Sequence, residues 1–262
     1  MKNEIIHVKD DRYAEYEDLL LRRDELKREA GSIRIEYVKE FGNLITELFH
    51  LEVDCIRLKK EISYAVASAN RGETIDIDAM KEQISGEMSD YQKQLDDMIQ
   101  ENEACRDAKE STEENLMKVK RLYRTIAKQL HPDINPKTED DFKLSELWTR
   151  VVAAYHALDL KEMEELSVLV TAALKAAGME ETEIDIPDIT EKIDQLKAEI
   201  EKIRTTDPYM YGELLNDRLS VADKKQELRD NIEEYKTYKN ELTEKLDQIL
   251  LKNGVQFKWG MK

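Results

Sequence analysis

The sequence is poor in turn-forming and aromatic residues. It holds 8 glycines and 4 prolines among 262 residues, less than half of their usual combined share, so it cannot form many tight turns. Aromatic residues make up only 6 % and charged residues 38 %, which leaves too little bulky apolar volume for a single spherical core. Because Glu, Lys, Leu, Ala and Gln favour helix, we expect an all-α protein with few, long helices.

The chain also lacks a net positive charge and long apolar runs, and it has only 2 cysteines. The net charge of -17 disfavours nucleic acid as a partner. The sequence contains no window of about 18 apolar residues, and Met1 to Ile6 are followed by no apolar run, so we expect neither a membrane span nor a secretory signal. Cys55 and Cys105 lie within helical patterns, and we expect them to be reduced apolar residues of a cytoplasmic protein. A functional thiol or a disulfide between them is the less favoured alternative.

Four stretches carry apolar residues at alternating intervals of four and three, which is typical of helices in coiled coils. Short loops between such helices predict antiparallel hairpins, and Gly31 and Gly72 are expected to end the first two helices. These seams can close within one chain or between the chains of a homodimer. The seam positions are Tyr37, Phe41, Leu44, Leu48, Leu51, Cys55, Leu58, Ile62 and Ala65; Ile84, Met88, Tyr91, Leu95, Met98, Asn102 and Cys105; Ile189, Ile193, Leu196, Ile200 and Ile203; and Leu228, Ile232, Tyr235, Leu242, Leu246 and Ile249.

Asn102 and Lys239 are polar positions on these seams. Asn102 either sets the register of the pair or lies at a frayed helix end. We divide the chain into an N-terminal coiled-coil region of residues 1–110, a helical hairpin with a following helix at 111–177, and a C-terminal coiled-coil hairpin with a tail at 178–262. In that tail, Phe257 and Trp259 are expected to cap the bundle, or alternatively to bind a partner segment.

The central region opens with a strongly basic segment. From Lys118 to Lys128 the chain has five basic residues and no acidic one. Its residues Lys120, Arg124 and Lys128 follow one another at intervals of four and form a positive helix face. A second stripe of apolar residues predicts a buried face; it consists of Val119, Tyr123, Ile126 and Leu130. Because the segment opposes the overall charge of the chain, it indicates an acidic partner surface.

The basic segment is followed directly by His131-Pro132-Asp133. Proline has no N–H group and forces the preceding residue out of the α region, so the helix must end at Leu130 or His131. A second helix is expected to start between Glu139 and Lys143, with an apolar face formed by Leu144, Leu147, Trp148, Val151, Val152, Tyr155 and Leu158. These features predict a helical hairpin with the tripeptide at its tip, and with Tyr123 and Trp148 in its core.

The run from Val119 to Asp133, with the Asn135-Pro136 that follows, resembles helix II and the signature loop of the J-domain (DnaJ-like) co-chaperone family. Trp148, Val151 and the segment 154–159 are similar to the apolar pattern of its helix III. The resemblance covers residues 118–159 only. The family's helix I, Gly/Phe-rich linker and zinc-binding Cys-x-x-Cys repeats have no counterpart, and their absence argues against a general client-binding role. We expect the helix around Asn102, or its continuation past Ser111, to pack in place of helix I.

The resemblance implies a binding function with no catalytic residues. His131, Pro132 and Asp133 would insert between the ATPase domain and the interdomain linker of a DnaK-type chaperone, with Asp133 facing a partner arginine. The basic residues that would steer this encounter are Lys120, Arg121, Arg124 and Lys128. The expected result is faster ATP hydrolysis by the chaperone, while the coiled coils provide client or location specificity. We expect no cofactor and no metal, since the sequence has no Gly-rich phosphate loop and its four histidines lack ligand spacing.

Two other functions are compatible with the same residues. One is a coiled-coil scaffold in which a relic J hairpin only packs the bundle. The other, less favoured, is an enzyme in which His131 and Asp133 act as an acid–base pair or as metal ligands. The tripeptide argues against the scaffold, because a helical hairpin can form without His131 or Pro132.

Overall fold

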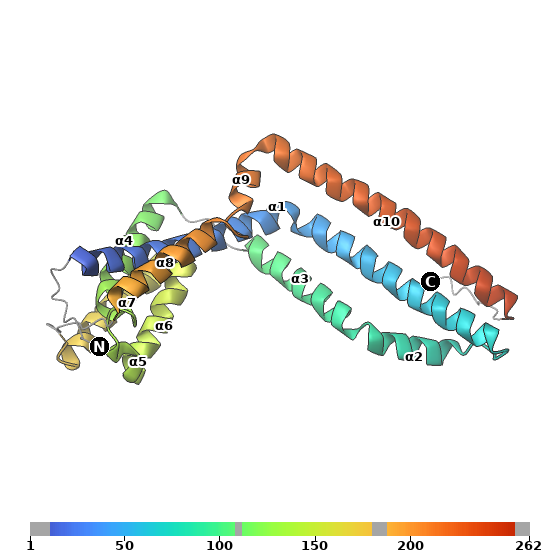
Figure 1. The fold of residues 1–262 in the computed structure, drawn as a ribbon, viewed down its shortest axis with the longest axis horizontal. Coiled ribbons are helices and arrows are strands. Elements are labelled where there is room, and N and C mark those ends of the chain that lie inside the picture. Colours follow the sequence, from blue (N-terminus) through green and yellow to red (C-terminus); the bar gives the residue numbers. More distant parts are fainter. Residues whose placement is uncertain (1–10, 108–111, 180–187, 255–262) are drawn as a thin grey trace. The chain divides into compact units, whose positions relative to one another are not determined.

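The computed structural model describes residues 11–107, 112–179 and 188–254 (Figure 1). Within these ranges the chain forms ten α-helices and no strand, which confirms the prediction of an all-α protein. None of the helices in the described ranges is long and apolar enough to cross a membrane. Phe257 and Trp259 lie outside the described residues.

The helices form two compact units, each assembled from separate stretches of the chain. Unit 1 comprises residues 1–34 and 109–212, and unit 2 comprises residues 35–108 and 213–262. The first helix, α1 (Asp11–Asn70), contributes residues to both units. The three consecutive regions expected from the sequence stay a prediction, since the units of the structure do not follow chain order.

Helix α1 runs without a break through Gly31, so the expected helix end at that residue is wrong. An interior glycine costs only about 1 kcal/mol relative to alanine, and the buried neighbours Leu26 and Ala30 help to offset that cost. The helix ends instead at Asn70, before Gly72, whose φ of 70° is the left-handed conformation typical of helix ends. The expected end at Gly72 is confirmed.

Unit 1 is built around three helices that pack on one another: α4 (Glu113–Leu130), α6 (Phe142–His156) and α7 (Leu160–Ala176). A short helix, α5 (Lys137–Asp140), precedes α6. Leu21 of α1 enters their hydrophobic cluster, whose larger members include Val119, Tyr123, Ile126, Leu130, Leu144, Leu147, Val151, Tyr155, Met163, Leu166 and Val170. Tyr123 is buried, as expected, and Trp148 is partly buried against the same cluster.

The first turns of α1 also contact α8 (Ile189–Arg204). A second cluster joins Tyr13, Tyr16 and Leu20 of α1 to residues of α8 and to Ile134, which follows the tripeptide; the α8 members are Ile189, Ile193 and Leu196. The start of α1 therefore has apolar contacts with α8 on one side and with the α4–α6–α7 cluster on another. This finding corrects the expectation for helix I, because α1, and not the helix around Asn102, packs against α4.

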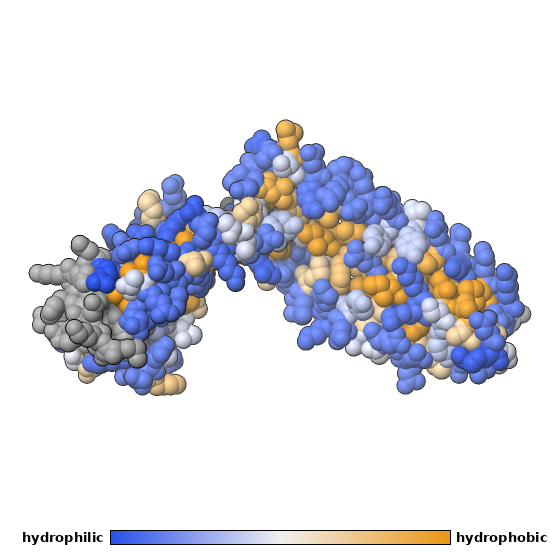
Figure 2. Space-filling view, viewed as in Figure 1, coloured by the Kyte–Doolittle hydropathy of each residue, from blue (hydrophilic) through white to orange (hydrophobic). Residues whose placement is uncertain are grey.

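In unit 2 the remainder of α1 packs against α2 (Ile77–Glu87), α3 (Ser89–Asp107) and α10 (Arg218–Lys252). Its seam residues from Cys55 to Ala65 meet Leu242, Leu246 and Leu250 of α10 in one cluster. Figure 2 shows hydrophilic residues on the outward faces of α3 and α10 and hydrophobic residues between these helices. The short α9 (Tyr211–Asn216) lies where the chain passes from unit 1 to unit 2.

Polar contacts give the helix directions in unit 2. Lys225 pairs with Glu40 and Lys239 with Asp54, both 185 residues apart, so α10 runs parallel to α1. Lys239, the polar position on its seam, thus meets a buried carboxylate, with 2.6 Å between Nζ and Oδ2.

On its other side α1 runs antiparallel to α2 and α3. Lys60 pairs with Glu87, and Asn102 donates from Nδ2 to Thr46 Oγ1 at 2.6 Å. A partly buried polar contact of this kind fits an asparagine that sets the register of the helix pair. The expected pairing of the last two seams with each other is not confirmed, because α8 belongs to unit 1 and α10 to unit 2.

We predict opposite effects for alanine at the two interior glycines of α1. A Cβ at Gly31 meets nothing within 4 Å, so Gly31→Ala should raise the free energy of unfolding by about 0.5–1 kcal/mol. A Cβ at Gly42 would lie 2.0 Å from Oδ1 of Asn102. Gly42→Ala should therefore displace Asn102 from Thr46 and destabilise the protein by about 1 kcal/mol. Urea denaturation of both variants checks this, and equal stabilisation by the two substitutions would contradict it.

Candidate functional site

The tripeptide forms a folded turn at the end of α4. The helix ends at Leu130, as predicted, and His131 has the extended backbone that a following proline imposes (φ −61°, ψ 127°). The backbone N–H groups of Ile134 and Asn135 donate to the His131 carbonyl at 2.9 and 2.7 Å. The Asp133 N–H donates to Nδ1 of the His131 ring at 3.1 Å. The turn therefore fixes the orientation of the imidazole.

The His131 side chain faces the interior of unit 1, and the residue is only 5 % exposed. Its ring meets the Trp148 ring edge-on, with 4.8 Å between the centroids. Nδ1 is thus occupied by the Asp133 N–H, and Nε2 is the ring nitrogen that faces α1. Nε2 lies 3.6 Å from Oδ2 of Asp24 and 3.2 Å from an Arg23 nitrogen. The Nε2 edge of His131 is thus covered by two residues of α1.

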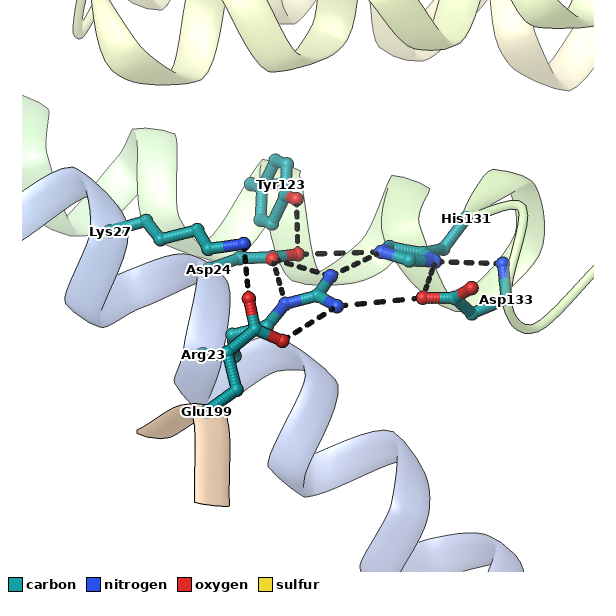
Figure 3. Close-up of polar contacts among 7 residues, drawn as sticks. All are labelled: Arg23, Asp24, Lys27, Tyr123, His131, Asp133 and Glu199. Atoms are coloured by element: carbon teal, nitrogen blue, oxygen red, sulfur yellow. Dashed lines mark hydrogen bonds and ion pairs between the residues drawn. The ribbon is translucent and has the colours of Figure 1, made fainter. Parts of the chain in front are cut away.

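Asp24 is the centre of this network (Figure 3). Its Oδ2 accepts the Tyr123 hydroxyl at 2.7 Å, and its Oδ1 accepts Nε and Nη2 of Arg23 at 3.0 and 2.9 Å. Burial disfavours the charged carboxylate, but the His131 hydrogen bond, the Arg23 charge and the Tyr123 hydrogen bond outweigh it and lower the pKa of Asp24 to about 2. Asp24 is therefore ionised at neutral pH.

Arg23 connects Asp24 to the exposed end of the tripeptide. Its Nη1 lies 3.6 Å from Oδ2 of Asp133 and 3.8 Å from Oε2 of Glu199 on α8. Burial by itself would lower the pKa of Arg23. The nearby carboxylates of Asp24, Glu199 and Asp133 have the opposite and larger effect, so the pKa is raised. Glu199 also accepts Lys27 of α1 at 2.7 Å. Figure 3 shows that Arg23 and Asp24 point from α1 toward His131 and Asp133.

The basic face of α4 is paired with acidic residues of the same α1 segment. Lys120 lies 2.6 Å and Arg124 3.6 Å from Glu25, and Lys128 pairs with Glu17. Glu17 and Glu25 are two helical turns apart on α1, about 12 Å, and Lys120 and Lys128 are equally far apart on α4. The first glutamate along the chain pairs with the second lysine, and the second glutamate with the first lysine. The helices therefore run antiparallel in register. Burial opposes ionisation of Glu25, but Lys120 and Arg22 outweigh it and lower its pKa.

The predicted site residues thus gather around one segment of the chain. His131, Asp133, Lys120, Arg124 and Lys128 all meet residues 17–25 of α1. By contrast, Arg121 is exposed and Pro132 is partly exposed.

Sequence reasoning missed the residues on the other side of the contact, which are Glu17, Arg23, Asp24 and Glu25. The one feature of the sequence that could have pointed to them is that Glu17 and Glu25 have the same spacing as Lys120 and Lys128. Such a match means little in a chain with 58 acidic residues.

A cavity of about 360 Å³ adjoins the tripeptide and is lined by His131, Trp148 and His156, among others. Burial lowers the pKa of His156, Asp24 opposes this shift, and the Arg28 and Lys27 charges add to it. Among the described residues no group of three or more His, Cys, Asp and Glu side chains is arranged to hold a metal ion. The charged and hydrogen-bonding groups around this cavity include Arg23, Asp24 and Asp133.

Comparison of the chain with protein-family models, with curated proteins and with solved structures finds no match.

We predict that Asp24 makes the stability of unit 1 depend on pH. Because its pKa is lowered from 3.8 to about 2, its contribution of about 2 kcal/mol is complete above pH 5 and is lost as the pH falls from about 4 to about 2. Asp24→Asn should thus reduce the free energy of unfolding at pH 7, and the gap to the wild type should narrow in acid. Urea denaturation at pH 7, 4 and 3 measures this gap. The control is Asp18→Asn, at an exposed position of the same helix; a gap for Asp24→Asn that is constant with pH would contradict the prediction.

The antiparallel ion pairs can be tested by exchanging their charges. Glu17→Lys/Glu25→Lys and Lys120→Glu/Lys128→Glu each place like charges opposite one another, and each should lower the melting temperature. The four-fold variant restores opposite charges in the same register, and it should recover much of the loss. Additive losses in the four-fold variant would show that these residues do not interact.

Proposed function

We propose that this chain is a J-domain co-chaperone that binds a DnaK-type chaperone and stimulates its ATP hydrolysis. The observation that carries the proposal is the position of His131-Pro132-Asp133. The tripeptide lies at the tip of the packed helices α4, α6 and α7, directly after a helix with a basic face. Neither feature is needed to hold a helical hairpin together, whereas both suit recognition of an acidic protein surface.

In this proposal the protein acts by binding and needs neither a cofactor nor a catalytic residue. The Asp133 side chain is 45 % exposed and would pair with an arginine of the chaperone. The exposed cations Arg121, Arg124 and Lys128, together with Lys120, would steer the encounter by long-range attraction. His131 and Pro132 would fix the shape of the inserted tip, because the turn holds the imidazole in one orientation.

The long helices would give the co-chaperone its location or its client. We propose that α1, α2 and α3 form an antiparallel coiled coil, to which α10 adds a parallel helix, and that this assembly binds a dedicated client protein. The seam residues of α1 meet α10 within one chain, which favours a monomer, although a homodimer stays possible. A cytoplasmic location fits two buried cysteines that form no disulfide in the described part of the chain. The net charge disfavours nucleic acid as a partner.

The alternative is a scaffold in which the tripeptide only clamps α1 onto α4. One specific observation favours it: His131 is buried, and its Nε2 edge faces Asp24 and Arg23 of the same chain. In that case the tripeptide would serve internal packing, and no chaperone would be stimulated. Binding of a DnaK-type chaperone to the full chain, weakened by added salt, would separate the two functions.

We predict that His131→Gln and Asp133→Asn each abolish the stimulation of a DnaK-type chaperone by the full chain. Single-turnover hydrolysis of chaperone-bound ATP measures this, with the chain in large excess over the chaperone. Lys137→Gln is the matched control, because Lys137 is exposed at the start of α5, close to the tripeptide but outside it. Thermal melting verifies that all three variants are folded. Undiminished stimulation by His131→Gln and Asp133→Asn would refute the assignment of the site.

A further inference from the structure

We propose that residues 17–28 of α1 are an autoinhibitory element that covers the chaperone-binding face of the hairpin. The inference rests on the proposed function, and it adds a regulation of the same site: the chain has a closed state, in which α1 occupies this face, and an open state, in which the face can bind a chaperone. Three features of the contact between α1 and α4 carry it.

The first feature is that Arg23 takes the place expected for an arginine of the chaperone. Its Nη1 lies 3.6 Å from the Asp133 carboxylate, while Glu199 and Asp24 hold the same guanidinium from two other directions. A guanidinium from another protein would have to compete with Arg23 for Asp133. One carboxylate side chain therefore serves both the closed state and the chaperone complex.

The second feature is the burial of His131. Its Nε2 edge faces Asp24 and Arg23, and its ring lies against Trp148. A residue with an exposed fraction of 5 % presents almost no surface to a partner. The His131 side chain thus becomes accessible only when α1 moves away from α4.

The third feature is the neutralisation of the basic face. Glu25 lies next to Lys120 and Arg124, and Glu17 lies next to Lys128. An acidic chaperone surface and the acidic residues of α1 would therefore compete for the same cations. Since paired charges contribute little field at a distance, the closed state would also attract the chaperone more slowly.

The packing of unit 1 allows residues 17–28 of α1 to detach while α4, α6 and α7 stay packed on one another. In the cluster that holds α4, α6 and α7 together, the buried member from α1 is Leu21, and the other buried members come from these three helices. Tyr13, Tyr16 and Leu20 pack against α8 and Ile134, and Arg28 lies over the Tyr155 ring of α6, 5.9 Å from its centroid. The α1–α4 contact is therefore mostly polar, and a charged competitor can displace it.

The test compares a variant that opens the contact with a variant of equal charge that leaves it intact. Glu17→Lys/Glu25→Lys places lysines opposite Lys128 and Lys120, whereas Asp18→Lys/Glu29→Lys makes the same charge change at positions of α1 outside these pairs. Hydrogen exchange of residues 129–135 reports whether the tip is uncovered. Single-turnover ATP hydrolysis by a purified DnaK-type chaperone reports its activity, with increasing concentrations of each full-length chain.

We expect Glu17→Lys/Glu25→Lys to exchange faster at the tip and to reach half-maximal stimulation at a concentration about tenfold lower than the wild type, because the competent fraction rises. The matched control should behave as the wild type, and adding His131→Gln to the opened variant should abolish its activity. Arg23→Ala provides a second opening that removes positive charge, so a gain there cannot come from added basic residues.

The outcomes separate this inference from the proposed function. Equal and strong stimulation by the wild type and both opened variants would leave the co-chaperone function intact and overturn autoinhibition. No stimulation by folded, opened variants whose tip exchanges rapidly, tried with several DnaK-type chaperones, would refute the co-chaperone function, and the inference would fall with it. If Glu17→Lys/Glu25→Lys does not fold, the same hydrogen-exchange and ATP-hydrolysis measurements on Arg23→Ala distinguish these outcomes.

Discussion

The organisation of unit 1 depends on one buried carboxylate. Asp24 is ionised in a largely buried position, where an unpaired charge would be very costly, and it is stabilised by three groups from different parts of the chain: the Arg23 guanidinium, the Tyr123 hydroxyl and the His131 ring. Loss of any one partner leaves the carboxylate with less compensation for its lost hydration. The network therefore contributes more to fixing the register of α1 on α4 than to net stability, since burial of an ion pair often costs about as much as it returns. Apolar contacts contribute the net stabilisation, with about 1.5–3 kcal/mol for each fully buried side chain such as Ile134 or Leu20.

This register links two features that are far apart in the sequence. Once Asp24 meets Tyr123 and His131, the antiparallel direction of the helices brings Glu25 to Lys120 and Glu17 to Lys128. Glu199 of α8 then holds Arg23 and Lys27 from the other side. As a result, a short acidic segment of α1 provides both a structural partner for α8 and a set of counter-charges for α4. Helix α1 then continues into unit 2, where it pairs with α10 through Asp54 and Lys239.

The same groups that would recognise a chaperone are satisfied within the chain. A carboxylate at the tip of a turn and a row of lysines can bind any surface that presents an arginine and acidic residues at matching spacing, and α1 presents both. The proposed co-chaperone and scaffold functions differ in whether these groups also bind a chaperone or serve the internal contact alone. The exposed fraction of Asp133 and the exposure of Arg121, Arg124 and Lys128 leave part of the face accessible in the closed state. An approaching chaperone could thus meet the rim of the face before α1 is displaced.

The sequence by itself determined the all-α class, the end of α4 before Pro132, the buried stripe that includes Val119 and Tyr123, and the basic face of α4. These properties follow from local chemistry: the spacing of side chains along one helix and the missing N–H of proline. The seams also predicted buried positions such as Phe41 and Ile232, but not their partners, because a heptad pattern specifies an apolar face without specifying what covers it. Only the tertiary structure decided that α1 continues through Gly31, that α8 and α10 each pack against α1, and that Arg23 and Asp24 meet His131. Such contacts depend on the summed packing and desolvation energies of segments about a hundred residues apart, which no local pattern encodes.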